Sequence, residues 1–249
     1  MEMLADFYGI PSVNFGVPVV KLLTEGKLVF TAEKKPEGDV IWFAGDGCHP
    51  RDEGHEIYLK LMAEAITQMK DSKPVDHKAQ LAKAFVADNW AAARMIPLSE
   101  KMLSGNWKAL PADDGKQKAF GGRMGQLWIA DQPGSKLHFK FKGSVAKVYD
   151  LLGPDGGQVT VTVDGKPGSK PVPRFDSYCV YHRIATLGVM VDGDAGQVHD
   201  VTVELHPEQP DRKSVSFRLK DPAKELAAPK FQGTRVWMSQ LMLLGDLVE

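Results

Sequence analysis

The pattern of apolar and polar positions changes part-way along the chain. Up to about residue 110 the apolar residues recur mainly at helical spacing, whereas from about residue 120 onward they alternate with polar residues in short runs separated by Gly, Pro and Asp. The change predicts an α/β part followed by an all-β part. We expect the first over residues 1–75, a helical connector over 76–115 and the β part over 116–249.

The first part alternates amphipathic helices with short apolar runs. Helical spacing predicts a helix from Met3 to Phe7, a second from Val19 to Thr24 and a longer one that begins at Asp52. Apolar runs at residues 10–15 and 40–43 predict buried strands between these helices. This order is typical of a parallel α/β sheet. Since two short strands cannot form a complete sheet, we expect the beginning of this domain to be missing from the chain.

The segment between the two parts has a polar start and then a helical pattern. Residues 71–76 are polar and include Pro74, which predicts a linker. Residues from Ala79 to Met95 carry apolar side chains at helical spacing, and Pro97 follows them. We therefore expect a helix from Ala79 to Met95.

The second part is dominated by strict alternation. Residues 137–142, 159–163, 201–206 and 215–220 each alternate apolar with polar side chains, as half-buried strands do. Turn sequences such as Gly-Pro-Asp-Gly-Gly separate them. We expect an antiparallel β-sandwich or jelly roll, closed by a strand from Arg235 to Leu244 and containing no helix of note.

Composition and charge exclude several classes of partner. The 249 residues include 31 basic and 32 acidic side chains, a net charge of −1, with no basic block that would favour nucleic acid. No apolar run approaches the roughly 20 residues of a membrane span, and the first residues lack the features of a signal peptide. Cys48 and Cys179 lie far apart, and the sequence indicates no metal and no cofactor.

An Asp and a His stand three residues apart in Asp46-Gly47-Cys48-His49-Pro50, directly after the apolar run at 40–43. The Gly and Pro residues predict a loop that projects its side chains. Asp46 could hold the imidazole of His49 in one tautomer and support its positive charge, as in a Ser-His-Asp triad. A second pair of the same spacing, Asp52 and His55, lies where a helix should begin, so we expect Asp52 to cap that helix instead.

Two groups of motifs resemble one known type of protein. Residues 5–14, 46–50 and 54–55 resemble the C-terminal third of an SGNH (GDSL-type) hydrolase, in which an Asp-x-x-His block closes the domain. Residues 139–143 together with the Gly and Asp turns at 153–157 and 161–165 are similar to jelly-roll domains often attached to bacterial SGNH hydrolases. The resemblance implies a partial flavodoxin-like α/β domain without its N-terminal part, followed by a jelly-roll sandwich.

The resemblance also implies an activity and the residues that perform it. The activity is hydrolysis of acyl esters, acetyl esters of carbohydrates in particular, on a small-molecule or polysaccharide substrate. His49 would be the base that takes the proton of a nucleophilic Ser, and Asp46 would orient it. The Gly-Asp-Ser motif of the family is absent, and Ser12 is the only serine within the matched residues. We therefore expect the chain as given to be inactive.

A second cluster mixes aromatic and basic residues. Tyr178, Tyr181 and Arg183 have the composition of sugar-binding sites, although an exposed strand edge explains them equally well. An alternative function is a non-catalytic β-sandwich that binds carbohydrate or acts as a scaffold, with the α/β part as a remnant. The resemblance implies an extracytoplasmic location, periplasmic or secreted, and the sequence indicates no oligomeric state.

Overall fold

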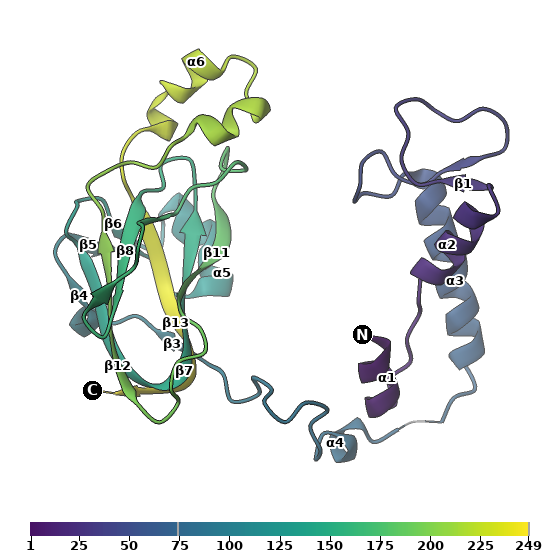
Figure 1. Ribbon diagram of the computed structural model, residues 1–249, viewed down its shortest axis with the longest axis horizontal. Coiled ribbons are helices and arrows are strands. Elements are labelled where there is room, and N and C mark those ends of the chain that lie inside the picture. The colour runs from purple at the N-terminus through teal and green to yellow at the C-terminus, as the bar shows by residue number, and fades with distance from the viewer. Residues whose placement is uncertain (74, 249) are drawn as a thin grey trace. The chain divides into compact units, whose positions relative to one another are not determined.

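The computed structural model describes residues 1–73 and 75–248 and divides the chain into two compact units (Figure 1). The first unit is Met1–Asn89 and the second is Trp90–Glu249. The division falls inside the segment predicted to be a connector. No helix in the described part of the chain is long and apolar enough to cross a membrane.

The first unit is mainly helical. Its elements are α1 (Glu2–Tyr8), α2 (Gly16–Thr24), β1 (Leu28–Val29), β2 (Ile41–Trp42), α3 (Asp52–Met69) and α4 (His77–Gln80). The strands β1 and β2 pair in parallel, with Leu28 opposite Ile41. A small core holds the unit together, made by Val19, Leu28, Phe43 and Ala44 with Leu22, Ile41, Ile57 and Tyr58 packed against them.

The predicted strand at residues 10–15 is wrong. These residues form no strand and are largely exposed, and the strand that pairs with β2 is β1. Pro11 has no N–H to offer a neighbouring strand, and in the described residues β1 and β2 form a sheet of only two strands. An apolar run without a pairing partner stays irregular.

The predicted helix from Ala79 to Met95 is also wrong, because only His77–Gln80 is helical there. Phe85 instead packs against Phe7, with ring centroids 5.2 Å apart. Its backbone N–H donates a hydrogen bond of 2.9 Å to the hydroxyl of Tyr8. An isolated helix of this length is marginal unless a whole face of it is buried, and no such burial is available here.

The second unit is built mainly from antiparallel strands. Its strands are β3 (Arg94–Pro97), β4 (Leu103–Ser104), β5 (Trp107–Ala109), β6 (Trp128–Ala130), β7 (Lys136–Leu152), β8 (Gln158–Val163), β9 (Lys166–Pro167), β10 (Val172–Pro173), β11 (Arg183–Met190), β12 (Val198–Leu205) and β13 (Val236–Val248). Its helices are η1 (Glu100–Met102), α5 (Gly115–Met124), η2 (Lys213–Arg218), α6 (Pro222–Leu226) and η3 (Pro229–Phe231). Every pair of these strands is antiparallel. The large antiparallel sheet that we expected is present, and its assignment to the jelly-roll class stays a prediction.

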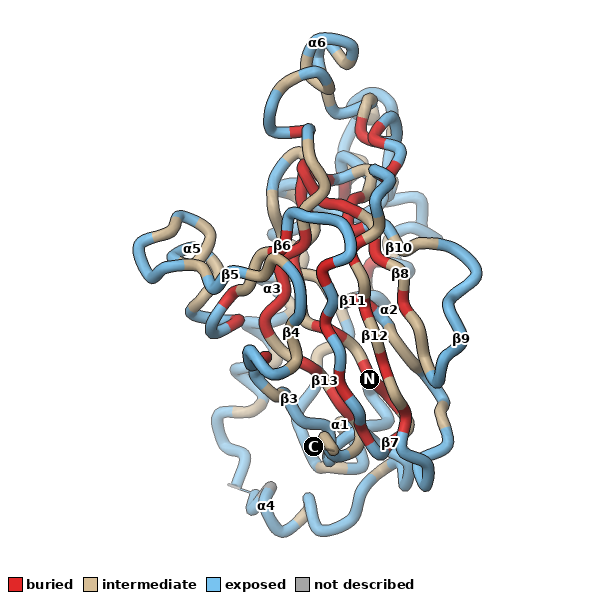
Figure 2. The backbone as a smooth tube through the Cα atoms, turned by 90° about the vertical axis from the view of Figure 1, so that its left-hand side faces the viewer, coloured by how far each residue is buried: buried red, intermediate tan, exposed pale blue. Residues whose placement is uncertain are grey.

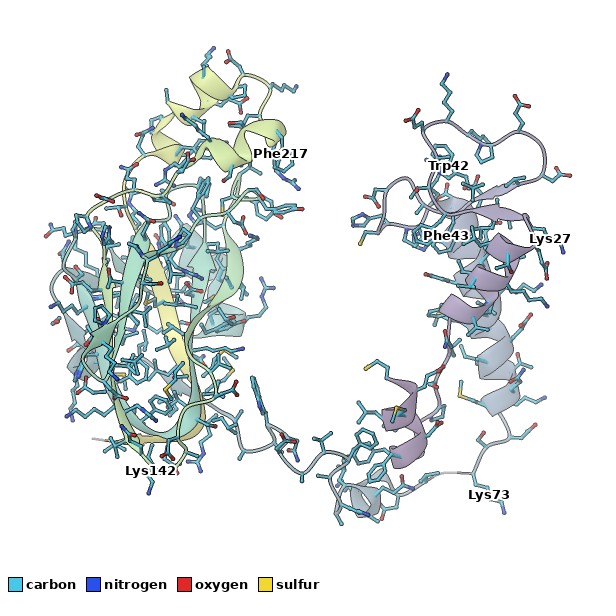
Figure 3. All side chains as sticks on the ribbon, in the orientation of Figure 1. Lys27, Trp42, Phe43, Lys73, Lys142 and Phe217 are labelled. Carbon is cyan, nitrogen blue, oxygen red and sulfur yellow. The ribbon has the colours of Figure 1, made fainter. Side chains whose placement is uncertain are left out.

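The long strand β7 belongs to both halves of this sheet. Its first half pairs with β12, its second half pairs with β11, and β13 lies along its other side. The sheet bends where Gly143 lies opposite Gly245, next to Lys142 in Figure 3. A Cβ added at Gly143 would lie 2.3 Å from the carbonyl oxygen of Leu244. The two backbones therefore approach more closely than any residue with a side chain allows.

The predicted alternation holds on three strands. Leu137, Phe139 and Phe141 are buried on β7 while the residues between them are exposed. On β8 and β12 buried residues alternate with half-buried ones, although Val163 at the end of β8 is half-buried too. The buried positions meet in one core, which also takes in residues of β13 such as Leu241. Figure 2 shows buried stretches running along β7, β12 and β13. The predicted closing strand is β13, which runs from Val236 to Val248.

The predicted strand at residues 215–220 is wrong. The helix η2 lies there, within the segment between β12 and β13 that we name the cap (residues 211–235, Figure 1). Val215 and Leu219 both reach a separate small core with Phe175 and Phe231, whereas Phe217 is exposed. Val215 lies on η2, and Leu219 follows directly after it in extended conformation, so both reach this core without a strand being formed. Among the described residues, no strand pairs with this segment.

We expected no helix of note in the β part of the chain, and this expectation is wrong because α5 lies there. Asp114 caps this helix by accepting hydrogen bonds from the backbone of Lys116 and Gln117, at 2.7 and 3.2 Å. Met124 at its end and Phe120 pack into the core of the unit. The two Gly residues at 121 and 122 lower the helix propensity of this segment. The hydrogen bonds to Asp114 and the packing of Phe120 and Met124 therefore stabilise the helix.

An ion pair lies inside the second unit. Asp150 of β7 accepts two hydrogen bonds from the guanidinium of Arg174, at 2.5 Å from Nε and 2.8 Å from Nη2. Both side chains are almost completely buried, with exposed fractions of 1% and 6%. Burial raises the pKa of Asp150 to about 6, against the opposing attraction of Arg174. The pair fixes the end of β7 to the segment that follows β10.

Removal of one partner of this pair should destabilise the second unit strongly. We expect Arg174→Met to lower the free energy of unfolding by about 3–5 kcal/mol, since it leaves the carboxylate of Asp150 buried and unpaired. The double variant Asp150→Leu with Arg174→Met should recover most of this loss, because it removes both charges. Urea denaturation of both variants measures the effect, and a cost below about 1 kcal/mol for the single variant would contradict a tightly coupled pair.

Candidate functional site

The loop that carries Asp46 and His49 is held closed at its base. It begins after β2, and an isolated antiparallel bridge joins Ala44 to Pro50. The backbone N–H of Arg51 donates to the carbonyl oxygen of Phe43 at 2.8 Å, next to the start of α3. Figure 3 labels Trp42 and Phe43 where the chain enters this loop. The loop is thus a short excursion between a strand and a helix.

A close approach between strand and helix fixes the direction of the loop. Gly54 in the first turn of α3 lies against Phe43, and a Cβ at Gly54 would be 2.6 Å from the carbonyl oxygen of Phe43. The guanidinium of Arg51 lies over the ring of Trp42, 4.0 Å from its centroid. These contacts position both ends of residues 44–51.

Within the loop, Asp46 binds His49 through both of its carboxylate oxygens. Oδ2 lies 2.8 Å from Nδ1 of the His49 ring, and Oδ1 accepts the backbone N–H groups of Cys48 and His49 at 2.8 and 2.7 Å. Because a carboxylate only accepts hydrogen bonds, the proton of a neutral imidazole is placed on Nδ1. The other ring nitrogen, Nε2, then carries a lone pair and can accept a proton.

The same contacts change the acidity of Asp46. The backbone N–H of His49, its ring and the backbone N–H of Cys48 together lower the pKa of Asp46 to about 2. The carboxylate is therefore ionised over the whole range in which an imidazole titrates. The side chain of His49 is 81% exposed, and its Nε2 makes no hydrogen bond within residues 1–73 and 75–248.

The second Asp and His pair lies on α3. Asp52 is the first residue of the helix and makes no capping hydrogen bond, so the expected cap is not formed. Its charge still lies in the first turn, where it favours the positive end of the helix dipole. His55 lies one turn further along. Ser12, the serine within the matched residues 5–14, lies in the exposed irregular segment between α1 and α2.

The aromatic and basic residues that we expected to bind sugar lie in the second unit. Tyr178 and Tyr181 are exposed, and Arg183 forms an ion pair with Asp176 at the start of β11. The guanidinium of Arg183 lies 5.9 Å from the ring centroid of Tyr178. The strand begins only at Arg183, so the two tyrosines occupy a turn and not a strand edge.

Two residues next to this turn escaped the sequence analysis. Phe217 packs edge-on against Tyr178, with centroids 6.5 Å apart, and Arg218 lies 4.0 Å above the ring of Tyr178. Both belong to η2, which the sequence pattern presented as a strand. The signal in the sequence that could have identified this site is the adjacency of an aromatic residue, Phe217, and an arginine, Arg218.

A buried polar network supports the same end of the second unit. Asp155 accepts hydrogen bonds from Nε2 of His182 and from Nη1 of Arg235, at 2.9 and 2.8 Å. Although burial alone raises it, these two hydrogen bonds leave the pKa of Asp155 below its usual value. Gly153 is required beside them, since a Cβ there would lie 2.2 Å from the ring of His182.

A groove of about 800 Å³ lies elsewhere on the second unit. His138 and Lys140 of β7 line it together with Glu100 and Lys101 of η1. Asp200 pairs with both His138 and Lys140, at 2.9 and 3.5 Å. Among the described residues, no group of three or more His, Cys, Asp and Glu side chains is arranged to hold a metal ion.

Comparison with known proteins places the fold beside that of esterases. No model of a protein family matches the sequence, and no curated protein matches it. The fold is similar to a two-domain esterase (CEX) active on acetylated mannans, co-crystallised with mannopentaose. That match has a TM-score of 0.61 and 14% identity, over 99% of this chain and 58% of that one. A second structure of a two-domain esterase (CEX) active on acetylated mannans matches with a TM-score of 0.53 and 12% identity, over 83% and 51%.

The comparison concerns the fold. The chain spans little more than half the length of these esterases, and at this identity the likeness does not by itself assign an activity. It shows that a fold similar to that of this chain occurs within a two-domain esterase active on acetylated mannans.

The acidity of Asp46 gives a direct test of the loop geometry. We expect its carboxyl to titrate near pH 2 by ¹³C NMR. In His49→Ala the midpoint should rise but stay below the ordinary value of about 3.9, because two backbone hydrogen bonds remain. Since the pKa is lowered on folding, the stability that Asp46 gives the loop is present above pH 4 and is lost as the pH falls through about 2. His55→Ala is the control and should leave the midpoint unchanged; an ordinary midpoint in the parent chain would contradict the geometry.

Proposed function

We propose that the chain is the His- and Asp-bearing part of a carbohydrate ester hydrolase of the SGNH type. Its substrates would be acyl esters of sugars or polysaccharides, acetyl esters among them. The Asp46–His49 pair is the observation that carries the proposal, because its geometry is that of the base and its orienting carboxylate. The esterases of similar fold act on acetylated mannans, which supports an acetylated polysaccharide as the substrate class.

The chemistry follows from the tautomer. With its proton on Nδ1, His49 offers the lone pair of Nε2 to the hydroxyl of a serine, whose Oγ then attacks the ester carbonyl carbon. Asp46, ionised above pH 2, stabilises the imidazolium that forms. The proton on Nε2 passes to the leaving alcohol. A water molecule, deprotonated by His49 in turn, then releases the acid and regenerates the serine.

We place the nucleophilic serine on a polypeptide segment outside residues 1–249. The exposed Nε2 of His49 has no hydroxyl partner in the described part of the chain, and Ser12 lies in an irregular segment after Pro11. Of the two-domain esterase, 42% of the length has no counterpart in this chain, since 58% is covered. A segment of that size is enough for the early strands of an α/β domain.

The first unit also presents a surface that such a segment would cover. A groove of about 890 Å³ is lined by residues 1–5, Tyr8 and residues 10–15, and many of its side chains are apolar. Large apolar side chains of α2 and α3 are exposed as well, including Val20, Leu23, Leu59 and Ile66. Parallel sheets are normally covered on both faces, so further strands beside β1 and β2 would bury this surface.

The chain alone should not hydrolyse esters. We expect purified residues 1–249 to exceed their His49→Ala variant in releasing nitrophenol from nitrophenyl acetate by no more than the rate of free imidazole, because the nucleophilic serine is not available. The measurement is the absorbance of nitrophenolate over time. Turnover that depends on His49 and clearly exceeds that of free imidazole at the same concentration would show that the chain contains its own nucleophilic residue.

Supplying the nucleophile should reveal the roles of the pair. The chain is to be extended by the polypeptide encoded upstream in the same reading frame, if that contains a Gly-Asp-Ser motif after a strand. We then expect His49→Ala to lower kcat by about 10⁶-fold and Asp46→Asn by about 10⁴-fold, as members of a triad do. His55→Ala should leave the rate unchanged.

Two outcomes would count against the proposal. Equal rates for the parent and the His49→Ala form of the extended enzyme would remove His49 from the mechanism. An upstream region that encodes no such motif would favour the alternative, a carbohydrate-binding or scaffolding β-sandwich with an α/β remnant.

A further inference from the structure

Two exposed aromatic rings meet where the cap contacts the turn before β11. Tyr178 is 50% exposed and Phe217 is 69% exposed, and their planes are nearly perpendicular, at 88°. Figure 3 shows Phe217 projecting from η2 at the outer end of the second unit. Neither ring is needed to fill a core, so both are available to a partner.

The exposure of Phe217 does not come from a loosely attached segment. On the same helix Val215 is completely buried, and Phe231 at the other end of the cap is buried with it. The guanidinium of Arg212 donates hydrogen bonds to the carbonyl oxygens of Pro154, Gly156 and Gly233, at 2.6 to 3.1 Å. The cap is therefore fixed to the sheet by apolar and polar contacts, and it presents Phe217 outward.

A cation lies against both rings. The guanidinium of Arg218 is 4.0 Å from the centroid of Tyr178 and 5.1 Å from that of Phe217. Stacking on Tyr178 restricts its rotamers, which prepares its N–H groups for a planar acceptor such as a carboxylate. Arg183 is paired with Asp176, whereas Arg218 has no ion-pair partner among the described residues.

The net charge of the cap is positive, whereas the net charge of the whole chain is slightly negative. Residues 211–235 contain seven Lys and Arg and three Asp and Glu, an excess of four positive charges, in a chain whose net charge is −1. The exposed basic residues are Lys213, Arg218, Lys220, Lys224 and Lys230. One of the three acidic residues, Glu225, accepts the backbone N–H groups of Lys220 and Asp221. The field at this surface favours an anionic ligand.

We propose that Phe217, Tyr178 and Arg218 form a binding site for a polysaccharide that bears carboxylates, such as one containing uronic acid units. The apolar face of a sugar ring stacks on Phe217, and the carboxylate of that sugar or its neighbour receives paired hydrogen bonds from Arg218. The choice of a carbohydrate rests on the proposed esterase function. The choice of an acidic one rests on the charge and geometry of the cap.

Affinity electrophoresis of the full chain tests the site. We expect native gels containing polygalacturonate to retard the chain, and gels containing its methyl-esterified form to retard it at least tenfold more weakly, as the loss of a charge-assisted hydrogen bond implies. Phe217→Ala should weaken binding of both polymers. Arg218→Gln should weaken binding of the acidic polymer about tenfold and abolish the preference. Both side chains are exposed, so melting curves should match those of the parent.

Matched controls separate this site from general charge attraction. Arg123→Gln removes an exposed arginine from α5, and we expect it to bind as the parent does. Equal loss in Arg123→Gln and Arg218→Gln, equal binding of both polymers by the parent, or unchanged binding in Phe217→Ala would each overturn the proposal. The readout does not depend on ester hydrolysis, so failure of the esterase proposal with retention of this binding, or the reverse, is visible directly.

Discussion

The close contact between Gly143 and Gly245 is the constraint on which the second unit depends. Strand β7 has to leave one set of neighbours and join another, and it does so at the point where its backbone approaches β13. Any side chain at either glycine would meet a carbonyl oxygen at 2.3 Å. Because the strand bends there, Leu137 and Phe141 on one half and Val148 on the other contribute to the same core. One pair of small residues thus allows one long strand to belong to two halves of the sheet.

The far end of β7 organises the polar part of the unit. Asp150 binds Arg174 there, and the loop that follows presents Asp155 and the carbonyl oxygens that receive Arg212. Buried charges of this kind are tolerated only when each finds a partner, and here each partner comes from a different segment of the chain. The consequence is that the turn after β7, the approach to β11 and the cap are fixed relative to one another. The exposed surface around Tyr178 and Phe217 lies on these segments, so its side chains are held in fixed positions as well.

The Asp46–His49 loop follows a different principle. The hydrogen bonds that Asp46 makes join residues no more than three positions apart, and the base of the loop is closed by the bridge from Ala44 to Pro50. Such a loop can set the tautomer of a histidine without help from a large core. Residues 44–51 contain no serine, and they cannot exclude water, because that requires other elements to pack over the loop and His49 is open to solvent. Orientation and proton transfer, the two roles proposed for the loop, are those that such local contacts allow.

The sequence by itself determined the features that depend on local interactions. Alternation identified β7, β8 and β12, and the spacing of Asp46 and His49 identified their hydrogen bond, since both depend on near neighbours along the chain. Tertiary structure decided the rest. The segments at 79–95 and 215–220 have clear periodicity, yet one lacks a surface to pack against and the other lacks a strand to pair with. A pattern states which face of an element would be buried, but only the partner supplied by the rest of the chain determines whether that element forms.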